Sequence, residues 1–243
     1  MDERRRLEDL ARRAARTGRT QFTRFLEPSS QPEASSAAHA EGVTAVFFGG
    51  FEDAERKMAA FCMSEPDEPF PIEALKLTWN AKFSDASHRD LLGAVMALGL
   101  KRETIGDICL GVSPGSAYLF CAAEVADSII GSLESAGRAH LKVARADKLE
   151  IAPPKGTEQR ITVQAPRMDA VLAAGYRLSR AEAQRLIAAG LVKLNHIPEL
   201  RGDVHLKAGD LISARGYGRL RVDAIQGETR KGRLAIRVFL YGK

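Results

Sequence analysis

The sequence predicts an α+β protein with several domains. Segments with helical periodicity alternate with short runs of strand-forming residues along the chain. The Pro-containing stretch Ile151-Ala-Pro-Pro-Lys-Gly-Thr-Glu-Gln159 interrupts this alternation and predicts a stiff linker. Charge changes there too, since residues 160–243 hold 16 Lys and Arg against 7 Asp and Glu, while residues 1–159 hold 20 against 24. We expect an N-terminal α/β domain (1–73), a central domain (74–150), a linker (151–163) and a small C-terminal domain (164–243).

Composition limits the class of protein. The 243 residues are 45% hydrophobic, which is enough for packed cores. No apolar run reaches the ~20 residues that span a bilayer, and the Arg-rich start lacks the apolar segment of a signal peptide. We therefore expect a cytoplasmic protein that does not bind membranes. Cys62, Cys109 and Cys121 lack metal-ligand spacing and predict buried thiols, with no disulfide, metal or cofactor.

The N-terminal domain is predicted to begin with an amphipathic helix over residues 2–15, with Leu and Ala on one face and Arg on the other. Pro and Ser residues predict a loop over residues 28–41. A buried strand (43–48), Gly49-Gly50 and a helix (52–61) follow. This order is compatible with a phosphate-binding loop, but neither G-x-G-x-x-G nor a Walker motif is present, so a tight strand-to-helix turn is favoured.

The central domain has the predicted order βαββαβ, which suggests a ferredoxin-like fold of the kind found in RNA-recognition motifs (RRM-like). Ser87 and Asp90 are expected to cap its first helix. Tyr118 and Phe120 alternate on one strand, where they either stack on bases or belong to the core. The predicted elements are strands 75–81, 105–112, 116–122 and 140–144 and helices 88–98 and 123–136.

The C-terminal domain contains the clearest local signals. Ser179 and Glu182 have capping-box spacing, and Gly190 is placed for a left-handed helix stop, so a helix is predicted over residues 179–189. A strand over residues 191–195 follows directly. Alternating residues predict three further strands that complete the domain, at 211–214, 220–225 and 234–240.

Basic residues gather on this helix and strand. Periodicity places Arg180, Gln184 and Arg185 on the polar side of the helix. Alternation points Lys193 and Asn195 away from the core, so we expect helix and strand to offer these side chains to one partner. Arg167 and Arg177 form a second basic cluster just before them. Concentrated positive charge of this kind gains free energy by releasing counterions from a phosphate backbone.

Four blocks of this region resemble the alpha-L RNA-binding domain first named in ribosomal protein S four. They are Arg167-Met-Asp169, Ser179-Arg180, Gly190-Leu-Val-Lys-Leu-Asn195 and Gly209-Asp-Leu-Ile212. Met168 replaces the family's Leu, and His196 stands where the family usually has Gly. Because Asn-Gly is the favoured type I′ turn, Asn195-His196 is expected to turn differently.

Further segments resemble the YlmH family of bacterial proteins over essentially the whole chain. They are Phe25-Leu-Glu-Pro28, Gly49-Gly-Phe-Glu-Asp-Ala-Glu-Arg-Lys57, Ser87-His-Arg-Asp-Leu-Leu-Gly-Ala94, Gly99-Leu-Lys-Arg-Glu-Thr-Ile-Gly-Asp107 and Arg215-Gly-Tyr-Gly-Arg219. The resemblance implies a non-enzymatic factor that binds structured rRNA and tRNA, with no DNA expected, on the large ribosomal subunit in ribosome-associated quality control. The expected RNA-binding residues are Arg167, Arg177, Ser179, Arg180, Gln184, Arg185, Lys193, Asn195, Arg201, Arg215 and Arg219.

Two other functions are compatible with the sequence. The same RNA-binding module occurs in RNA-modifying enzymes such as pseudouridine synthases and methyltransferases, and an unrecognised catalytic site in residues 1–150 could contain Asp85, His88, Asp90 and Asp107. However, no nucleophile motif or Rossmann fingerprint is present. The third possibility is an interaction module whose N-terminal half binds protein alone.

Overall fold

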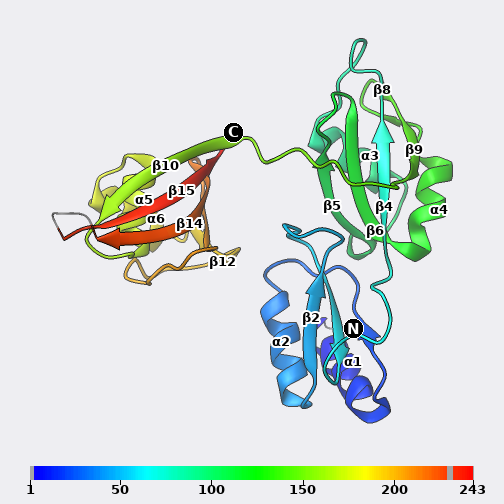
Figure 1. Cartoon of the computed structure of the whole chain (residues 1–243), viewed down its shortest axis with the longest axis horizontal. Coiled ribbons are helices and arrows are strands. Elements are labelled where there is room, and N and C mark those ends of the chain that lie inside the picture. Colours follow the sequence, from blue (N-terminus) through cyan, green and yellow to red (C-terminus); the bar gives the residue numbers. More distant parts are fainter. Residues whose placement is uncertain (1–2, 229–231, 243) are drawn as a thin grey trace. The chain divides into compact units, whose positions relative to one another are not determined.

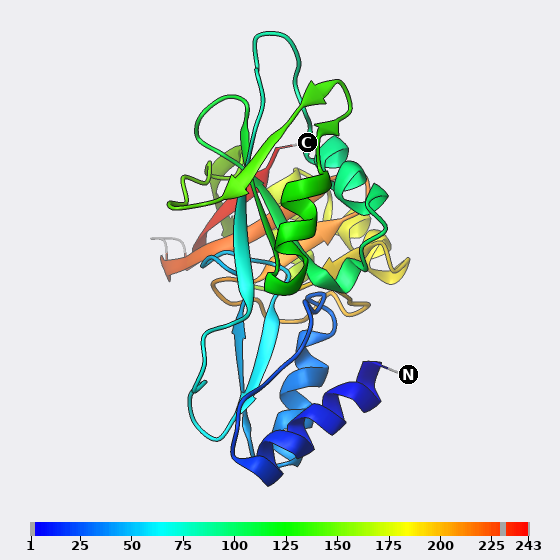
Figure 2. The same ribbon diagram turned by 90° about the vertical axis from the view of Figure 1, so that its right-hand side faces the viewer.

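The computed structural model describes residues 3–228 and 232–242 and has a mixed α+β fold with several antiparallel sheets (Figures 1 and 2). The chain divides into two compact units, Met1–Pro153 and Pro154–Lys243. Within the described ranges, no helix is both long and apolar enough to cross a bilayer.

The first unit begins with two helices on a small antiparallel sheet. Helices α1 (Glu3–Thr17) and α2 (Gln31–Ala40) pack on three strands in the order β1 (Gln21–Phe22), β3 (Met58–Cys62) and β2 (Thr44–Phe48). The predicted amphipathic helix is confirmed, since Leu7, Ala11 and Ala14 of α1 are buried. The prediction of a loop over 28–41 is wrong. Pro32 lies in the first turn of α2, where its missing N–H costs nothing, and three alanines of α2 are buried.

The helix predicted over residues 52–61 is also wrong, because Met58–Cys62 is the central strand β3 and all five of its residues are buried. A strand covered on both faces reads as a continuous apolar run without alternation, so the sequence could not separate it from a buried helix. The strand predicted at 43–48 is present as β2, but it is a partly exposed edge strand.

Gly49 and Gly50 therefore lead from strand to strand, and neither a strand-to-helix turn nor a phosphate-binding loop is formed. Their lack of a side chain is needed for close packing. A Cβ at Gly49 would collide with Ala54, and one at Gly50, where φ is +98°, would collide with the ring of Phe120. These glycines let the β2–β3 loop lie against the central part of the unit.

The central part has the predicted element order. Strands β4 (Ile72–Thr78), β5 (Ile105–Leu110), β6 (Ser116–Ala122) and β9 (Lys142–Arg145) form an antiparallel sheet in the order β5-β6-β4-β9. Helices α3 (His88–Ala97) and α4 (Ala123–Ser132) cover one face of it (Figure 2). The predicted capping box of Ser87 and Asp90 is confirmed. Helix α4 is shorter than predicted, since 133–141 contains the small hairpin β7 (Ser135–Ala136) and β8 (Ala139–His140). A 3-10 turn, Arg102–Thr104, precedes β5.

The opposite face of this sheet is covered by the N-terminal part. Tyr118 and Phe120 of β6 are 1% and 0% exposed and pack with Phe25 and Met58. The ring of Phe51 stacks on that of Phe120 with centroids 4.8 Å apart. Tyr118 and Phe120 are therefore core residues, and the alternative that they stack on RNA bases does not hold.

The second unit is a six-stranded antiparallel sheet covered by two helices (Figure 1). Helices α5 (Met168–Tyr176) and α6 (Arg180–Ala188) pack on one face over a core that includes Val171, Ile187 and Val192. The sequence predicts a linker over 151–163, and in the structure residues 156–163 form the first strand. The strand order is β10 (Gly156–Val163), β15 (Leu234–Tyr241), β14 (Gly218–Glu228), β13 (Leu211–Ala214), β11 (Val192–Leu194) and β12 (Ile197–Pro198).

Candidate nucleic-acid interface

Helix α6 begins at the predicted cap. Glu182 N–H donates to Ser179 Oγ at 3.2 Å, and the Glu182 carboxylate accepts from the Ser179 N–H at 2.8 Å and from its hydroxyl at 2.7 Å. These hydrogen bonds to Ser179 lower the pKa of Glu182. Its hydroxyl and its N–H are both engaged with Glu182, so Ser179 sets where α6 begins.

The capped helix delivers two side chains to a buried carboxylate. Asp169, on the first turn of α5, has a fully buried side chain. Its Oδ2 accepts hydrogen bonds from Arg180 at 2.7 Å, Arg167 at 3.1 Å and Gln184 at 3.3 Å. Arg167 also donates from Nε to Oδ1 at 3.2 Å. We call Asp169 with Arg167, Arg180 and Gln184 the Asp169 centre.

Electrostatics keep this carboxylate ionised. Burial by itself raises the pKa of Asp169, but hydrogen bonds from Arg167, Arg180 and Gln184 outweigh burial and hold the pKa below its ordinary value. The side chains of Arg167 and Arg180 remain 39% and 52% exposed, so both stay accessible to a partner. One negative and two positive charges leave the centre with a net positive charge at the surface.

Sequence reasoning placed Asp169 in a motif block but did not identify it as a site residue. Its role follows from burial and from the convergence of α5 and α6, neither of which is visible in the spacing of residues. The Arg-x-Asp order of Arg167 and Asp169 is the one local signal that could have indicated the pair. The sequence predicts Arg167 in a separate cluster with Arg177, whereas the structure joins it to Arg180 and Gln184 through the Asp169 carboxylate.

Arg177 and Arg185 complete the basic surface of the helices. Arg177 ends α5 in the left-handed conformation with φ 57°, and Arg185 lies in the last turn of α6. Both side chains are exposed. Within residues 3–228 and 232–242, neither guanidinium has a hydrogen bond or an ion pair. Both are therefore available to phosphates.

Lys193 and Asn195 lie elsewhere. Lys193 is exposed on the sheet face away from α5 and α6, where register places it opposite Ser213, and Ser213 opposite Arg219. The Asn195 side chain donates to Asp210 at 2.9 Å and accepts from the Leu211 N–H at 2.9 Å. Asn195 therefore stabilises the fold locally, and these two residues do not join the Asp169 centre.

The expected departure from a type I′ turn at Asn195-His196 is wrong. The two residues connect the paired positions Leu194 and Ile197, and their φ values are 49° and 70°. Positive φ at both central residues of a two-residue hairpin is the type I′ pattern. The pairing of β11 with β12 and the Asn195–Asp210 contact hold His196 in a conformation that disfavours a side chain.

The remaining predicted site residues are dispersed. The Arg201 guanidinium lies 3.5 Å from the carboxylate of Glu199, which also accepts from the Arg201 N–H at 2.9 Å. Arg215 is exposed in the turn after β13. Arg219 stacks over the ring of Tyr241, with its guanidinium carbon 4.7 Å from the ring centroid.

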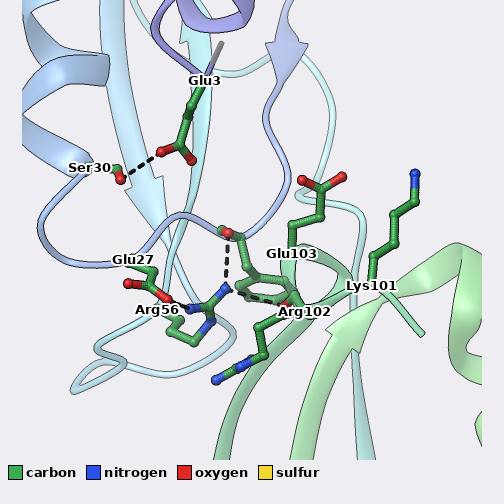
Figure 3. Close-up of a pocket in the computed structure, with 8 residues that line it drawn as sticks. Glu3, Glu27, Ser30, Arg56, Lys101, Arg102 and Glu103 are labelled. Carbon is green, nitrogen blue, oxygen red and sulfur yellow. Dashed lines mark hydrogen bonds and ion pairs between the residues drawn. The ribbon is translucent and has the colours of Figure 1, made fainter. Parts of the chain in front are cut away.

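The first unit contains a pocket that Arg56 and Arg102 line together with acidic side chains (Figure 3). Arg56 is 7% exposed and donates to the carbonyls of Ile105, Phe25 and Arg102 at 3.0 to 3.3 Å. It also pairs with Glu27 at 3.2 Å. These bonds engage the Arg56 guanidinium inside the protein and connect segments of the fold. Arg56 is therefore a structural residue of the pocket wall and does not present its charge to a ligand.

The acidic residues considered for a catalytic site are engaged separately. Asp90 caps α3, and Asp107 accepts from the backbone N–H groups of Glu55 and Arg56 at 2.6 and 3.2 Å. Burial raises the pKa of Asp107 despite these bonds. Asp85 accepts from the N–H of Ala86, and His88 is exposed. Among the described residues, no group of three or more His, Cys, Asp or Glu could hold a metal ion.

The three cysteines are free thiols. Cys62 and Cys121 are buried and Cys109 is partly buried. Burial raises the pKa of Cys109 and of Cys121 to about 12, so neither is a thiolate at neutral pH.

Comparison with known proteins gives matches over both units. Residues 66–150 match the family described as "Putative RNA-binding domain in YlmH", and residues 166–212 match the S4 domain. The chain is 34% identical over 218 residues to the ribosome-associated protein quality control protein P2 of Bacillus subtilis (strain 168), covering 88% of this chain and 84% of that protein. A solved structure, the cell division protein ylmH from Streptococcus pneumoniae, is 21% identical with a TM-score of 0.46, over 60% of this chain and 92% of that one.

Proposed function

This chain belongs to the YlmH family and carries an S4 domain, and we propose from this premise that it is a non-enzymatic factor that binds structured RNA on the ribosome. The RNA would be rRNA and tRNA of the large ribosomal subunit, in the cytoplasm, during ribosome-associated quality control. The name of the Bacillus relative supports the ribosomal part of the proposal.

The Asp169 centre is the observation that carries the proposal. A buried anion fixes two partly exposed guanidinium groups, and Arg177 and Arg185 add two more charges on the same pair of helices. Oriented guanidinium groups bind phosphates in a bidentate manner and lose little side-chain entropy on binding. The surplus of basic residues in 160–243 adds a long-range attraction for a polyanion.

The first unit has a supporting part in this proposal. We propose that its central segment, 74–150, is a ferredoxin-like domain, and the strand order β5-β6-β4-β9 supports this proposal. Because the aromatic residues of its sheet are buried under the N-terminal part, RNA would contact this domain through edges and loops. The engagement of Asp90 and Asp107 by separate backbone groups supports the non-enzymatic proposal.

The test uses the full-length protein and the double variant Arg177→Ala with Arg185→Ala. Each lost phosphate contact lowers the slope of log affinity against log salt by about one, so the pair should lower it by about two and weaken ribosome co-sedimentation. Neither side chain has a bonded partner among the described residues, so the melting temperature should stay unchanged. Arg180 is avoided because its loss would uncover Asp169.

Arg13→Ala with Arg16→Ala is the matched control, because it removes the same charge from exposed positions of α1. If both double variants reduce binding equally, general charge explains the attraction and the helices of the second unit have no special role. Unchanged co-sedimentation of the Arg177 and Arg185 variant would contradict the proposed site.

A further inference from the structure

The sheet of the second unit has a second face with a composition of its own. On β14 and β15, Leu220, Val222, Ile236 and Val238 point into the core under α5 and α6. The alternate residues point the other way, since successive side chains of a strand leave opposite faces. They are Arg219 and Arg221 of β14 and Arg237, Phe239 and Tyr241 of β15, and we call them the outer-face residues.

These side chains form a layered arrangement of rings and guanidinium groups. Arg219 lies 4.7 Å from the ring centroid of Tyr241, and Arg221 lies 5.7 Å from that of Phe239. The two rings meet edge to face with centroids 5.1 Å apart. Gly156 of β10 makes room for this arrangement, because a Cβ there would press on the ring of Phe239. The rings and the two arginines are half-buried, so they are held in place while part of each remains accessible.

Charge on this face favours an anionic partner. Arg160 of β10 lies directly opposite Arg237, and both are exposed. Like charges directly opposite each other destabilise a sheet, so this pair costs stability unless an anion lies between them. Lys193 lies on the same face, two strands from β14. Among the side chains that the structure describes on this face, Asp223, which pairs with Arg221 at 2.8 Å, and Glu158 offset part of this charge.

We propose that this outer face binds unpaired nucleotides of RNA, as a second contact beside the Asp169 centre. Bases would stack on the rings of Phe239 and Tyr241 or on the guanidinium planes of Arg219 and Arg221, while Arg160, Arg237 and Lys193 take phosphates. Aromatic rings and arginine planes on a basic surface bind single strands with little sequence preference, because every base has a π face. The inference rests on the proposed RNA-binding function but concerns the face away from α5 and α6.

The outer face fits RNA better than a protein segment. Residues of β14 and β15 are paired on both sides within the sheet, so no strand can be added there. Its described polar groups are mostly cationic, and its largest apolar groups are the rings of Phe239 and Tyr241. Except for Lys193, the residues lie outside the segment 166–212 that matches the S4 domain.

The test measures two probes on the full-length protein, a 12-nucleotide oligouridine and an RNA hairpin. Phe239→Leu with Tyr241→Leu keeps apolar volume but removes both π faces, so oligouridine affinity should fall roughly 5- to 100-fold. Hairpin affinity should change less than about twofold, because that probe uses the helices. Phe239→Trp should retain oligouridine binding and show quenched tryptophan fluorescence when the oligonucleotide binds.

Arg160→Gln with Arg237→Gln tests the same face without touching packed rings, and it should weaken oligouridine binding even if the Leu variant folds poorly. The inference is overturned if the parent does not bind oligouridine or if the Gln variant binds it like the parent. It is also overturned if only Arg177→Ala with Arg185→Ala reduces oligouridine binding, although the proposed function then stands. If every variant, including Arg177→Ala with Arg185→Ala, bound the hairpin like the parent, that result would contradict the proposed function instead.

Discussion

Arg56 in the first unit and Asp169 in the second are both buried charges, but they are neutralised in opposite ways. Arg56 donates to three backbone carbonyls and to Glu27, and all of these belong to the interior or to its rim. Asp169 accepts from arginine side chains that are 39% and 52% exposed. The buried cation, Arg56, has its partners within the fold, whereas the buried anion, Asp169, holds two arginines at the surface.

The difference separates a buried charge that stabilises the fold from one that positions functional groups at the surface. A buried charge must be paired or hydrogen-bonded, because leaving it bare costs several kcal/mol. When its partners are backbone carbonyls, the gain is the fixed position of the segments that carry them. When its partners are arginine side chains, the gain is the fixed direction of surface charges. This contrast predicts that changes at Arg56 and Asp169 affect different measurements.

The largest effect is expected for Arg56→Met. The change removes the Arg56 donor from the buried carbonyl of Phe25 and one of two donors from that of Arg102, which keeps the N–H of Ile105. We therefore expect a loss of about 3 kcal/mol in the free energy of unfolding of the first unit. Urea unfolding of the full-length protein measures it. Hairpin RNA affinity, measured well below the unfolding transition, should not change.

Arg6→Met is the control for Arg56, because Arg6 pairs with Glu103 at 3.1 Å but both side chains are about 40% exposed. Exposed pairs contribute under about 1 kcal/mol. If Arg56→Met destabilised the protein no more than Arg6→Met, burial would not be what makes Arg56 important, and the comparison with Asp169 would lose its basis.

Asp169→Asn comes next. The substitution keeps the shape but removes the charge that binds Arg167 and Arg180, and we expect a loss of about 2 kcal/mol, since hydrogen bonds to charged groups contribute about 1.5–3 kcal/mol. The RNA result discriminates between two explanations. If net positive charge alone drives binding, the variant should bind the hairpin more tightly, because it is more positive by one unit. Loss of fixed guanidinium directions predicts weaker binding, which we expect; an increase in affinity would contradict the positioning role.

The pH dependence of the same variant is a separate prediction. The folded-state pKa of Asp169 lies below the ordinary value of 3.8, so the stability from its ionised form is fully present above that value and is lost as pH falls through the folded pKa. Parent and Asp169→Asn should therefore differ in unfolding free energy by a constant amount above about pH 5 and converge below about pH 4. A difference that grew with acidity would refute this assignment.

Much of the fold was accessible from the sequence because the signals were local. The capping boxes at Ser87 and Ser179 and the face of α1 each depend on residues within one or two turns. The errors at α2 and β3 have the opposite origin. Alanine-rich and uniformly apolar segments take their structure from the partners that cover them, and those partners are distant in sequence.

The candidate site shows the same limit. Helical periodicity placed Arg180 and Gln184 on one polar side of a helix, and the sequence assigned Arg167 to a second basic cluster just before it. It could not reveal that Asp169 is buried beneath them or that Lys193 and Arg219 share the other face of the sheet. Register between strands decides the second point, because it sets Lys193 opposite Ser213 and Ser213 opposite Arg219.

The smallest effect is expected at His196, which is not among the residues bound to Arg56 or those of the Asp169 centre. A change at His196 therefore gives a baseline for the changes at those two sites. A left-handed conformation costs a residue with a side chain about 1–2 kcal/mol, and glycine avoids this cost but loses about 0.5–1 kcal/mol through the flexibility of the unfolded chain. With φ 70° in the hairpin turn, His196→Gly should thus stabilise the second unit by roughly 0.5 kcal/mol, measured as a higher Tm. Hairpin RNA affinity and the pH dependence near pH 4 should match the parent, because the turn contributes neither a buried charge nor a surface guanidinium. A variant that lost stability would show that the His196 side chain makes a contact that outweighs its backbone strain. A variant that lost RNA affinity would extend the binding surface beyond α5 and α6 to the β11–β12 hairpin.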